Sequence, residues 1–137
     1  MPLIEYTNLT ARQKENYNFA NVSSRLADYG YSCSRLTDDW DGADFIAVHI
    51  DGSMRKVQLK SRLYFRERYS RKELWIVFRD GDDVYFFPHD KLLSKFISIG
   101  AINTEADSWR VHGWWAWPGI PKKYLCHVIE YRLDRPS

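Results

Sequence analysis

The chain has 137 residues, 45% of them hydrophobic and 16% aromatic, and a net charge of +2. This composition excludes a disordered protein, and the length suits one domain covering residues 1–137. No apolar run in the sequence approaches the roughly 20 residues that a membrane-spanning helix needs, and the first residues lack the apolar core of a signal peptide, so we expect a cytoplasmic protein without membrane contact. Cys33 and Cys126 lie far apart without CxxC spacing, which indicates neither a disulfide framework nor a zinc site.

The first predicted element is a helix of about 18 to 20 residues between Thr10 and Gly30. Thr10 and Gln13 have the spacing of a capping box, and Gly30 is a typical C-terminal stop. The apolar stripe of this helix consists of Phe19, Val22, Leu26 and Tyr29. Glu15 lies one turn before Phe19 on the same stripe, so its carboxylate is expected to face whatever the helix packs on. Two interpretations stay open for Glu15: a metal ligand, or an acid favoured by the helix dipole.

Three strands are predicted next. Residues 31–36 alternate as a short strand, and 37–42 read as an acidic turn. Residues 43–50 are apolar at nearly every position, which predicts a central strand covered on both faces. Residues 54–62 alternate between apolar and polar side chains, as a strand with one polar face does.

The second half of the chain predicts further strands and then helices. Residues 74–80 and 84–88 read as a hairpin, and 89–100 as a helix. An aromatic strand or loop is expected over 108–121, and a closing helix over 121–134. This order of elements predicts an α/β fold with a central mixed β-sheet flanked by helices.

Polar side chains interrupt the second and third strands. Asp44 lies at the head of one strand, and Gln58 and Lys60 are two residues apart on the next. Burying such groups without partners is costly, so something must compensate them. A three-residue loop at 51–53 would place Asp44 opposite Lys60 on one face, whereas a two-residue loop would turn Asp44 away from both other side chains. A shared site therefore requires an odd loop or a bulge.

This pattern resembles the PD-(D/E)XK nuclease superfamily over roughly residues 10 to 90, where an Asp and an acid-x-Lys pair occupy adjacent strands behind an N-terminal helix. The resemblance implies a restriction-endonuclease-like αβββαβ core. It implies Asp44 as the metal-binding Asp, Lys60 as the catalytic Lys and Glu15 as the helix acid. Two departures stand out: Gly-Ala stands where Pro often precedes the Asp, and Gln58 replaces the usual acid, as it does in some members of the superfamily.

Phosphodiester hydrolysis explains these residue types. A hard cation such as Mg²⁺ or Mn²⁺ positions water and neutralises charge on the phosphoryl group. Its expected ligands are Asp44, the amide oxygen of Gln58, the backbone C=O of Leu59, and Glu15, with Asp41 as a substitute for Glu15. Lys60 would orient the attacking water or stabilise the transition state. Because an amide replaces a carboxylate, we expect weaker metal binding unless Glu15 or Asp41 contributes. The alternative is a cross-strand ion pair between Asp44 and Lys60, with Gln58 at a sheet edge.

Basic residues cluster beside this pattern. Residues 53–72 contain eight Lys or Arg and one acid. The block indicates a polyanionic partner, most simply DNA, although Lys and Arg also protect exposed strand edges. The expected phosphate-binding residues are Arg55, Lys56, Arg62, Arg66, Arg68, Arg71 and Lys72.

Three functions follow in order of preference. The first is a Mg²⁺-dependent DNA endonuclease, which would act as a homodimer if it cuts both strands. The second is a nuclease-like domain that binds nucleic acid without cutting it. The third is a protein-interaction module that uses the aromatic C-terminal region. In that region the Trp side chains either form core or stack on bases, with Trp114 or Trp115 as the better stacking candidates.

Overall fold

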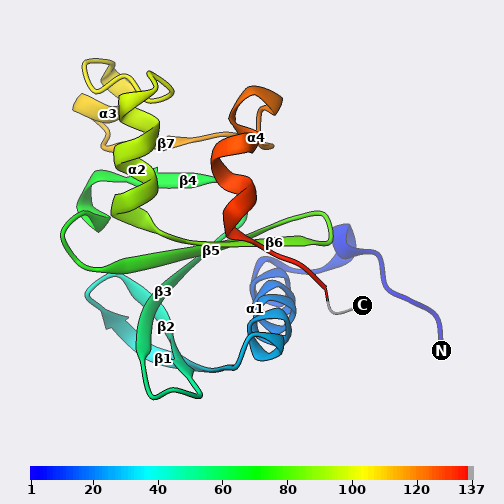
Figure 1. The fold of residues 1–137 in the computed structure, drawn as a ribbon. Coiled ribbons are helices and arrows are strands. Elements are labelled where there is room, and N and C mark those ends of the chain that lie inside the picture. The colour runs from blue at the N-terminus through cyan, green and yellow to red at the C-terminus, as the bar shows by residue number, and fades with distance from the viewer. Residues whose placement is uncertain (136–137) are drawn as a thin grey trace.

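The computed structural model describes residues 1–135, and six of their strands form one mixed sheet. These strands are β1 (Tyr31–Trp40), β2 (Ala43–His49), β3 (Met54–Lys60), β5 (Leu74–Asp80), β6 (Asp83–Pro88) and β8 (Arg132–Leu133). Their order in the sheet is β1-β2-β3-β5-β6-β8 (Figure 1). Strands β3 and β5 run parallel, and the other neighbouring pairs are antiparallel. The predicted mixed sheet is therefore confirmed.

The N-terminal helix α1 (Ala11–Asp28) follows the 3-10 turn η1 (Tyr6–Asn8) and covers one face of the sheet. Both hydrogen bonds of the predicted capping box are present: the Gln13 backbone N–H donates to the Thr10 hydroxyl, and the Thr10 N–H donates to the Gln13 side chain. Val22 and Leu26 are fully buried against the sheet. Capping and an apolar stripe thus produce the helix that the sequence predicts.

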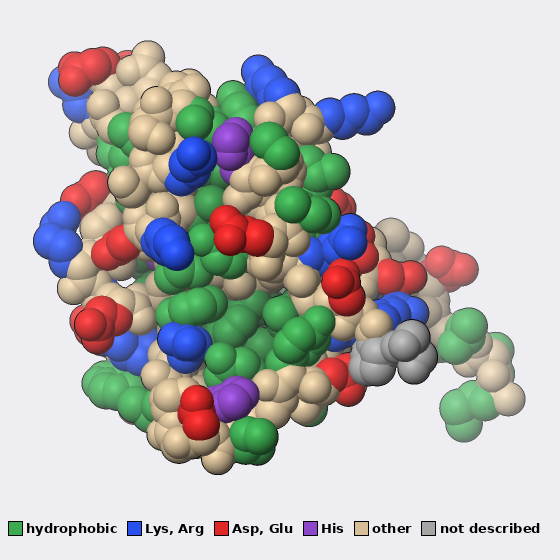
Figure 2. Space-filling view, in the orientation of Figure 1, with side chains coloured by type: hydrophobic (Ala, Val, Ile, Leu, Met, Phe, Trp, Pro, Cys, Tyr) green, Lys and Arg blue, Asp and Glu red, His purple; other side chains and the backbone are tan. Residues whose placement is uncertain are grey.

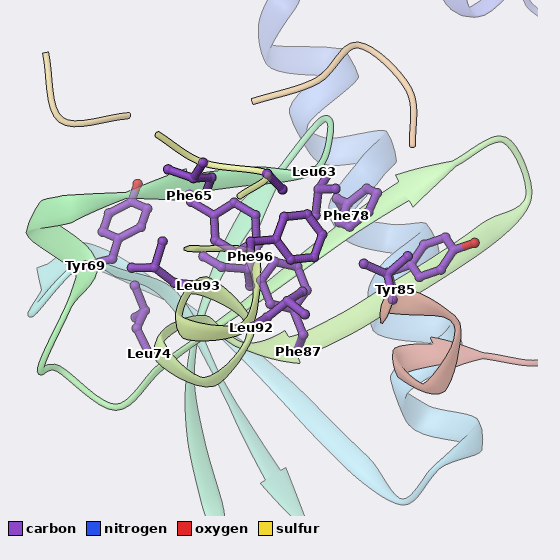
Figure 3. Close-up of a cluster of buried hydrophobic side chains, with 14 of the residues drawn as sticks. Leu63, Phe65, Tyr69, Leu74, Phe78, Tyr85, Phe87, Leu92, Leu93 and Phe96 are labelled. Carbon is purple, nitrogen blue, oxygen red and sulfur yellow. The ribbon is translucent and has the colours of Figure 1, made fainter. Parts of the chain in front are cut away.

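The remaining elements cover the opposite face. They are α2 (His89–Ser98), α3 (Asp107–Arg110), α4 (Lys122–Val128) and a two-stranded sheet of β4 (Tyr64–Arg66) and β7 (Trp114–Ala116). Along β5, Val77 packs on the α1 side while Ile76 and Phe78 pack on the other, so the sheet separates two apolar clusters. Figure 3 shows Phe65 of β4 and Phe96 of α2 together in the larger cluster, with ring centroids 5.1 Å apart. Helices therefore flank both faces, as predicted.

The crossover between β3 and β5 differs from a simple αβββαβ order. Parallel neighbours need a connection of about a dozen residues, usually a helix. Residues 61–73 form this connection, but they contain β4 and the 3-10 turn η2 (Glu67–Tyr69) where the predicted core order would have an α-helix. The short strand is stabilised by its pairing with β7. This connection brings β4 directly after Lys60.

Two predictions for the first strands are wrong. Strand β1 continues to Trp40, and the turn is confined to Asp41 and Gly42, both with positive φ. The pairing with β2 is irregular after Arg35 and resumes at Trp40, which lies opposite Ala43, and the polar residues between them can stay exposed because β1 is an edge strand. The far end of β2 is also less covered than predicted, since Val48 is 42% exposed.

The C-terminal helix is shorter than predicted. Helix α4 ends at Val128, and the 3-10 turn η3 (Ile129–Tyr131) leads into β8, which pairs with β6. This pairing covers a length of sheet edge that would otherwise expose backbone donors and acceptors. The aromatic segment before α4 contains both the short helix α3 and the strand β7. Within residues 1–135, no helix is both long and apolar enough to cross a membrane.

Candidate active site

The loop between β2 and β3 decides which side chains share a face. The strands pair from Phe45 opposite Val57 to Val48 opposite Met54. The His49 N–H donates to the Ser53 carbonyl at 2.8 Å, which leaves three residues at the tip of the loop. The odd loop that a shared site requires is therefore present.

The register within this hairpin differs from the predicted one. Continuing the observed pairing by one residue places Asp44 opposite Gln58, two residues short of the predicted partner Lys60. The difference arises because Asp51 accepts two hydrogen bonds from Ser53 and thereby fixes the turn earlier on the third strand. A shift of two residues preserves the face, so Asp44, Gln58 and Lys60 still belong to one side of the hairpin.

Asp44 connects the two strands beyond their last regular pair. Its carboxylate accepts a hydrogen bond from the Leu59 backbone N–H at 2.9 Å. In an extended strand the N–H and C=O of one residue point to the same side, so the Leu59 carbonyl also faces this gap. The arrangement places a carboxylate and a backbone oxygen beside each other, with Gln58 and Lys60 on either side of Leu59 in the chain.

The surroundings of Asp44 disfavour its charge. Although the side chain is exposed, protein atoms displace part of its hydration, and this desolvation is the main reason that its pKa is raised. The negative charges of Glu15 and Asp39 raise the pKa further, while the Leu59 hydrogen bond and the Lys60 ammonium lower it. A carboxylate kept in such surroundings is typical of a functional site.

Glu15 of α1 and Asp44 line the same hollow. This cavity has a volume of about 280 Å³ and also includes Arg35, Phe45 and Leu59. The predicted helix acid, which is exposed, and the predicted metal-binding Asp thus border one hollow. However, within residues 1–135 no three His, Cys, Asp or Glu side chains lie close enough together to hold a metal ion. A cation here would have to use Gln58 and backbone oxygens beside Asp44.

Lys60 lies on the other side of Leu59. It lines a second hollow of about 340 Å³, and Leu59 contributes to the walls of both cavities. Its ammonium lies 4.4 Å from the centre of the Tyr64 ring and 5.5 Å from that of Tyr69. Burial lowers the pKa of Lys60, and the nearby charges of two arginines lower it as well, whereas Tyr64 and Asp44 raise it. The half-buried Lys60 ammonium thus attracts the Asp44 carboxylate from a separate hollow.

The basic block divides into two groups. Arg55 donates to the Tyr31 hydroxyl and stacks over Trp75, and Lys56 forms a 3.0 Å ion pair with Asp41. These contacts lie at the end of β3 away from Lys60.

The second group follows Lys60. Arg66 and Arg68 lie close enough to Lys60 to lower its pKa, and Arg62 is exposed in the connection to β4. Arg71 is exposed and forms an ion pair with Glu67, and Lys72 is partly exposed. On the face shown in Figure 2, Lys and Arg side chains are interspersed with Asp and Glu rather than gathered in one patch. Of the second group, Arg66 and Arg68 are the residues whose charges reach Lys60.

The tryptophans of the aromatic C-terminal segment are at most partly buried. Trp109, Trp115 and Trp117 pack against the larger apolar cluster, whereas Trp114 is 42% exposed. Trp114 is therefore the most exposed tryptophan of this segment, and the other three cover part of the core.

Several residues of the site have no clear signal in the sequence. Arg79 lines the hollow of Lys60 and donates to Asn18, and Arg35 donates to Asn16 on α1 beside Asp44. Arg79 could have been found from the rule that parallel strands end at the same sheet edge, but only if the parallel pairing of β3 and β5 were known. Comparisons with protein-family models, curated proteins and solved structures find no match for this chain. The site is therefore interpreted from its own geometry.

Proposed function

We propose that this protein is a metal-dependent endonuclease that hydrolyses phosphodiester bonds in DNA, with the Gln-x-Lys variant of the PD-(D/E)XK site. The observation that carries the proposal is the hydrogen bond from the Leu59 backbone to the Asp44 carboxylate, which joins the predicted metal-binding Asp to the Gln58-Leu59-Lys60 segment. The odd loop between β2 and β3 supports it as well.

The donor atoms suit a hard cation. Mg²⁺ takes oxygen ligands and is commonly held by one or two carboxylates together with waters and substrate phosphates. The residues that would hold it are Asp44 through its carboxylate, Gln58 through its amide oxygen and Leu59 through its backbone carbonyl, with Glu15 across the hollow. When bound, Mg²⁺ or Mn²⁺ supplies a positioned water and neutralises charge on the phosphoryl group. One carboxylate is enough for such a site, although it binds the cation weakly.

The chain's own residues then act on the phosphate. Lys60 donates hydrogen bonds to a phosphoryl oxygen, and its half-buried position strengthens this interaction because little water screens it. Arg66 and Arg68 lie next to it and hold flanking phosphates. One chain carries one such site, so cutting both strands of a duplex requires a homodimer. A cytoplasmic location is part of this proposal.

The test is cleavage of supercoiled plasmid by the wild-type protein in Mg²⁺ or Mn²⁺, with single-stranded DNA and RNA as additional substrates. Lys60→Ala should abolish nicking, while Lys95→Ala removes the same charge from α2, which lines a different cavity, and should leave nicking unchanged. Metal-dependent nicking that is lost only in Lys60→Ala supports the proposal. Absence of cleavage with every substrate would refute it.

A second candidate is a domain that binds nucleic acid without cutting it. It is favoured by one observation: residues 1–135 contain no group of three metal-ligating acids, His or Cys. This candidate predicts salt-dependent nucleic-acid binding that persists in Asp44→Ala and requires no divalent cation.

A further inference from the structure

The outer face of the β4–β7 sheet carries aromatic rings beside Lys60. Strand residues alternate between faces, and Phe65 is fully buried in the core cluster (Figure 3), so its neighbours Tyr64 and Arg66 fall on the other face of β4, where Tyr64 still packs partly against that cluster. Trp114 pairs with Arg66 across the two strands and therefore shares their face, whereas Trp115 pairs with Phe65.

The Tyr64 and Trp114 rings stack on each other. Tyr64 and Trp114 are parallel within 2°, with centroids 6.2 Å apart. Trp114 is 42% exposed although the other tryptophans of this segment pack against the core. Leaving a large ring in water without packing it loses stabilisation that burial would provide. Its exposure leaves the ring accessible to a ligand.

The backbone on either side of Tyr64 and Trp114 is held by hydrogen bonds to neighbouring segments. The Ser108 hydroxyl donates to the Trp114 carbonyl at 2.7 Å, and the Glu67 N–H donates to the Gly113 carbonyl at 2.8 Å. On the other strand, the Arg66 N–H donates to the buried His89 ring at 3.1 Å. A preformed aromatic surface binds a flat ligand without the entropic cost of ordering loops.

The cations around Tyr64 and Trp114 indicate the chemistry of a ligand that would fit them. The Lys60 ammonium lies 4.4 Å from the centre of the Tyr64 ring, and Arg66 is the cross-strand neighbour of Trp114. The charge of Arg68 reaches both Lys60 and Tyr69. A ligand that suits this surface has a flat ring next to a negative charge, which is the chemistry of a nucleotide.

We propose that Tyr64 and Trp114 form a stacking platform for an unpaired base next to the phosphate held by Lys60. The bases of an intact duplex are covered by their stacked neighbours, so side chains can stack only on bases that are single-stranded or extruded. This inference rests on the proposed function and names its substrate class: single-stranded or locally opened nucleic acid.

The test is fluorescence anisotropy in EDTA, which measures binding without cleavage. The probes are a labelled oligothymidylate, an abasic sugar–phosphate strand of the same length and a duplex. The variants are Trp114→Ala and Trp114→Phe, with Trp40→Ala as the matched control. Trp40 is similarly exposed at 48% and has a lysine 5.6 Å from its ring, but it lies on β1 of the large sheet.

Trp114→Ala should weaken binding of the oligothymidylate by about 5-fold to 100-fold, the range expected for one base stacked on an aromatic ring. Trp114→Phe keeps a ring and should stay within about threefold of the wild type. Binding of the abasic strand and the duplex, and every affinity of Trp40→Ala, should be unchanged. Unchanged duplex binding also shows that the variant is folded.

The platform is refuted if Trp114→Ala weakens all three probes equally, or weakens none of them, or if the wild type binds the abasic strand as tightly as the oligothymidylate. These results are separate from the cleavage assay. If the protein cuts DNA but binds strands with and without bases equally well, the nuclease proposal stands and the stacking proposal is refuted. If the protein binds unpaired bases through Trp114 but never cuts, the stacking proposal stands and the nuclease proposal is refuted.

Discussion

The Asp44 carboxylate accepts a hydrogen bond from the Leu59 backbone N–H at 2.9 Å, at the point where the β2–β3 pairing ends. Desolvation and the charges of Glu15 and Asp39 nevertheless raise its pKa. We therefore expect Asp44→Asn to increase the free energy of unfolding at pH 7. The Asn carbonyl keeps the Leu59 hydrogen bond while the disfavoured charge is removed. The gain should be on the order of a few tenths of a kcal/mol, because solvent screens an exposed carboxylate.

The stability difference between Asp44→Asn and the wild type should depend on pH. The unfolded chain loses the Asp44 proton near pH 3.8, below the folded pKa, so the folded state binds more protons between the two values and the wild type loses stability as pH rises through them. The advantage of Asp44→Asn should therefore be present at pH 7 and vanish near pH 3.5, as measured by urea unfolding. A variant less stable than the wild type at pH 7 would show that Asp44 is a structural residue.

Gln58→Glu should tighten divalent cation binding. The amide lies opposite Asp44 in the continued register, so a second carboxylate would be added beside the first. We expect roughly tenfold tighter Mn²⁺ binding by calorimetry, since ligand charge tunes such sites. Gln13→Glu is the matched control, because it adds the same charge at the exposed helix cap and can keep the capping box. Equal affinities in Gln58→Glu and Gln13→Glu would place the cation elsewhere.

His89 should make folding sensitive to acid. It is fully buried, its Nε2 accepts from the Arg66 N–H at 3.1 Å, and its Nδ1 lies 2.9 Å from Asp90. Burial lowers its pKa below 6.5, although Asp90 partly offsets this effect. The unfolded chain therefore takes up the proton first, so the stability from neutral His89 is complete above about pH 6.5 and is lost as pH falls toward the folded pKa.

Removing this side chain tests the same contact. His89→Ala leaves a cavity and an unpaired Arg66 N–H, which should cost about 3 kcal/mol of unfolding free energy. It should also flatten the loss of stability between pH 7.5 and 5.5, whereas His112→Ala, at an exposed position, should do neither. Parallel pH profiles for the wild type and His89→Ala would contradict the buried neutral ring.

Nucleic-acid binding should depend on the arginines near Lys60 rather than on the whole basic block. Arg68→Ala should weaken binding across sequences and reduce the slope of log affinity against log salt by about 1. Lys95→Ala, which removes one charge from α2, should leave the slope unchanged. The same loss in both variants would indicate attraction to net charge alone.

The fold was predictable where local rules suffice. The capping box at Thr10 and the stripe to Leu26 predicted α1, and the paired apolar runs predicted the β5–β6 hairpin. The end of β1 was missed because its exposed polar residues show no alternation at a sheet edge. Strand β8 was missed because its pairing with β6 is a contact across nearly fifty residues.

The candidate site was likewise predictable where it depends on neighbouring strands and not where it depends on contacts distant in the sequence. Asp44, Gln58 and Lys60 could be placed on one face from the spacing of two adjacent strands, although the exact register could not. Arg79 and Asn18 approach Lys60 only because β3 and β5 run parallel and α1 packs across them. The stacking of Tyr64 against Trp114 depends on β7 returning to β4, which no local pattern predicts.

The most direct test of the nuclease is the rate at which Asp44→Asn and the wild type nick supercoiled plasmid in Mn²⁺, measured side by side. Because Asp44→Asn is expected to be at least as stable as the wild type, lost activity cannot be attributed to unfolding. We predict metal-dependent nicking by the wild type and a loss of at least about a hundredfold in Asp44→Asn. Nicking at equal rates by both proteins, or by neither, would contradict a catalytic site at Asp44.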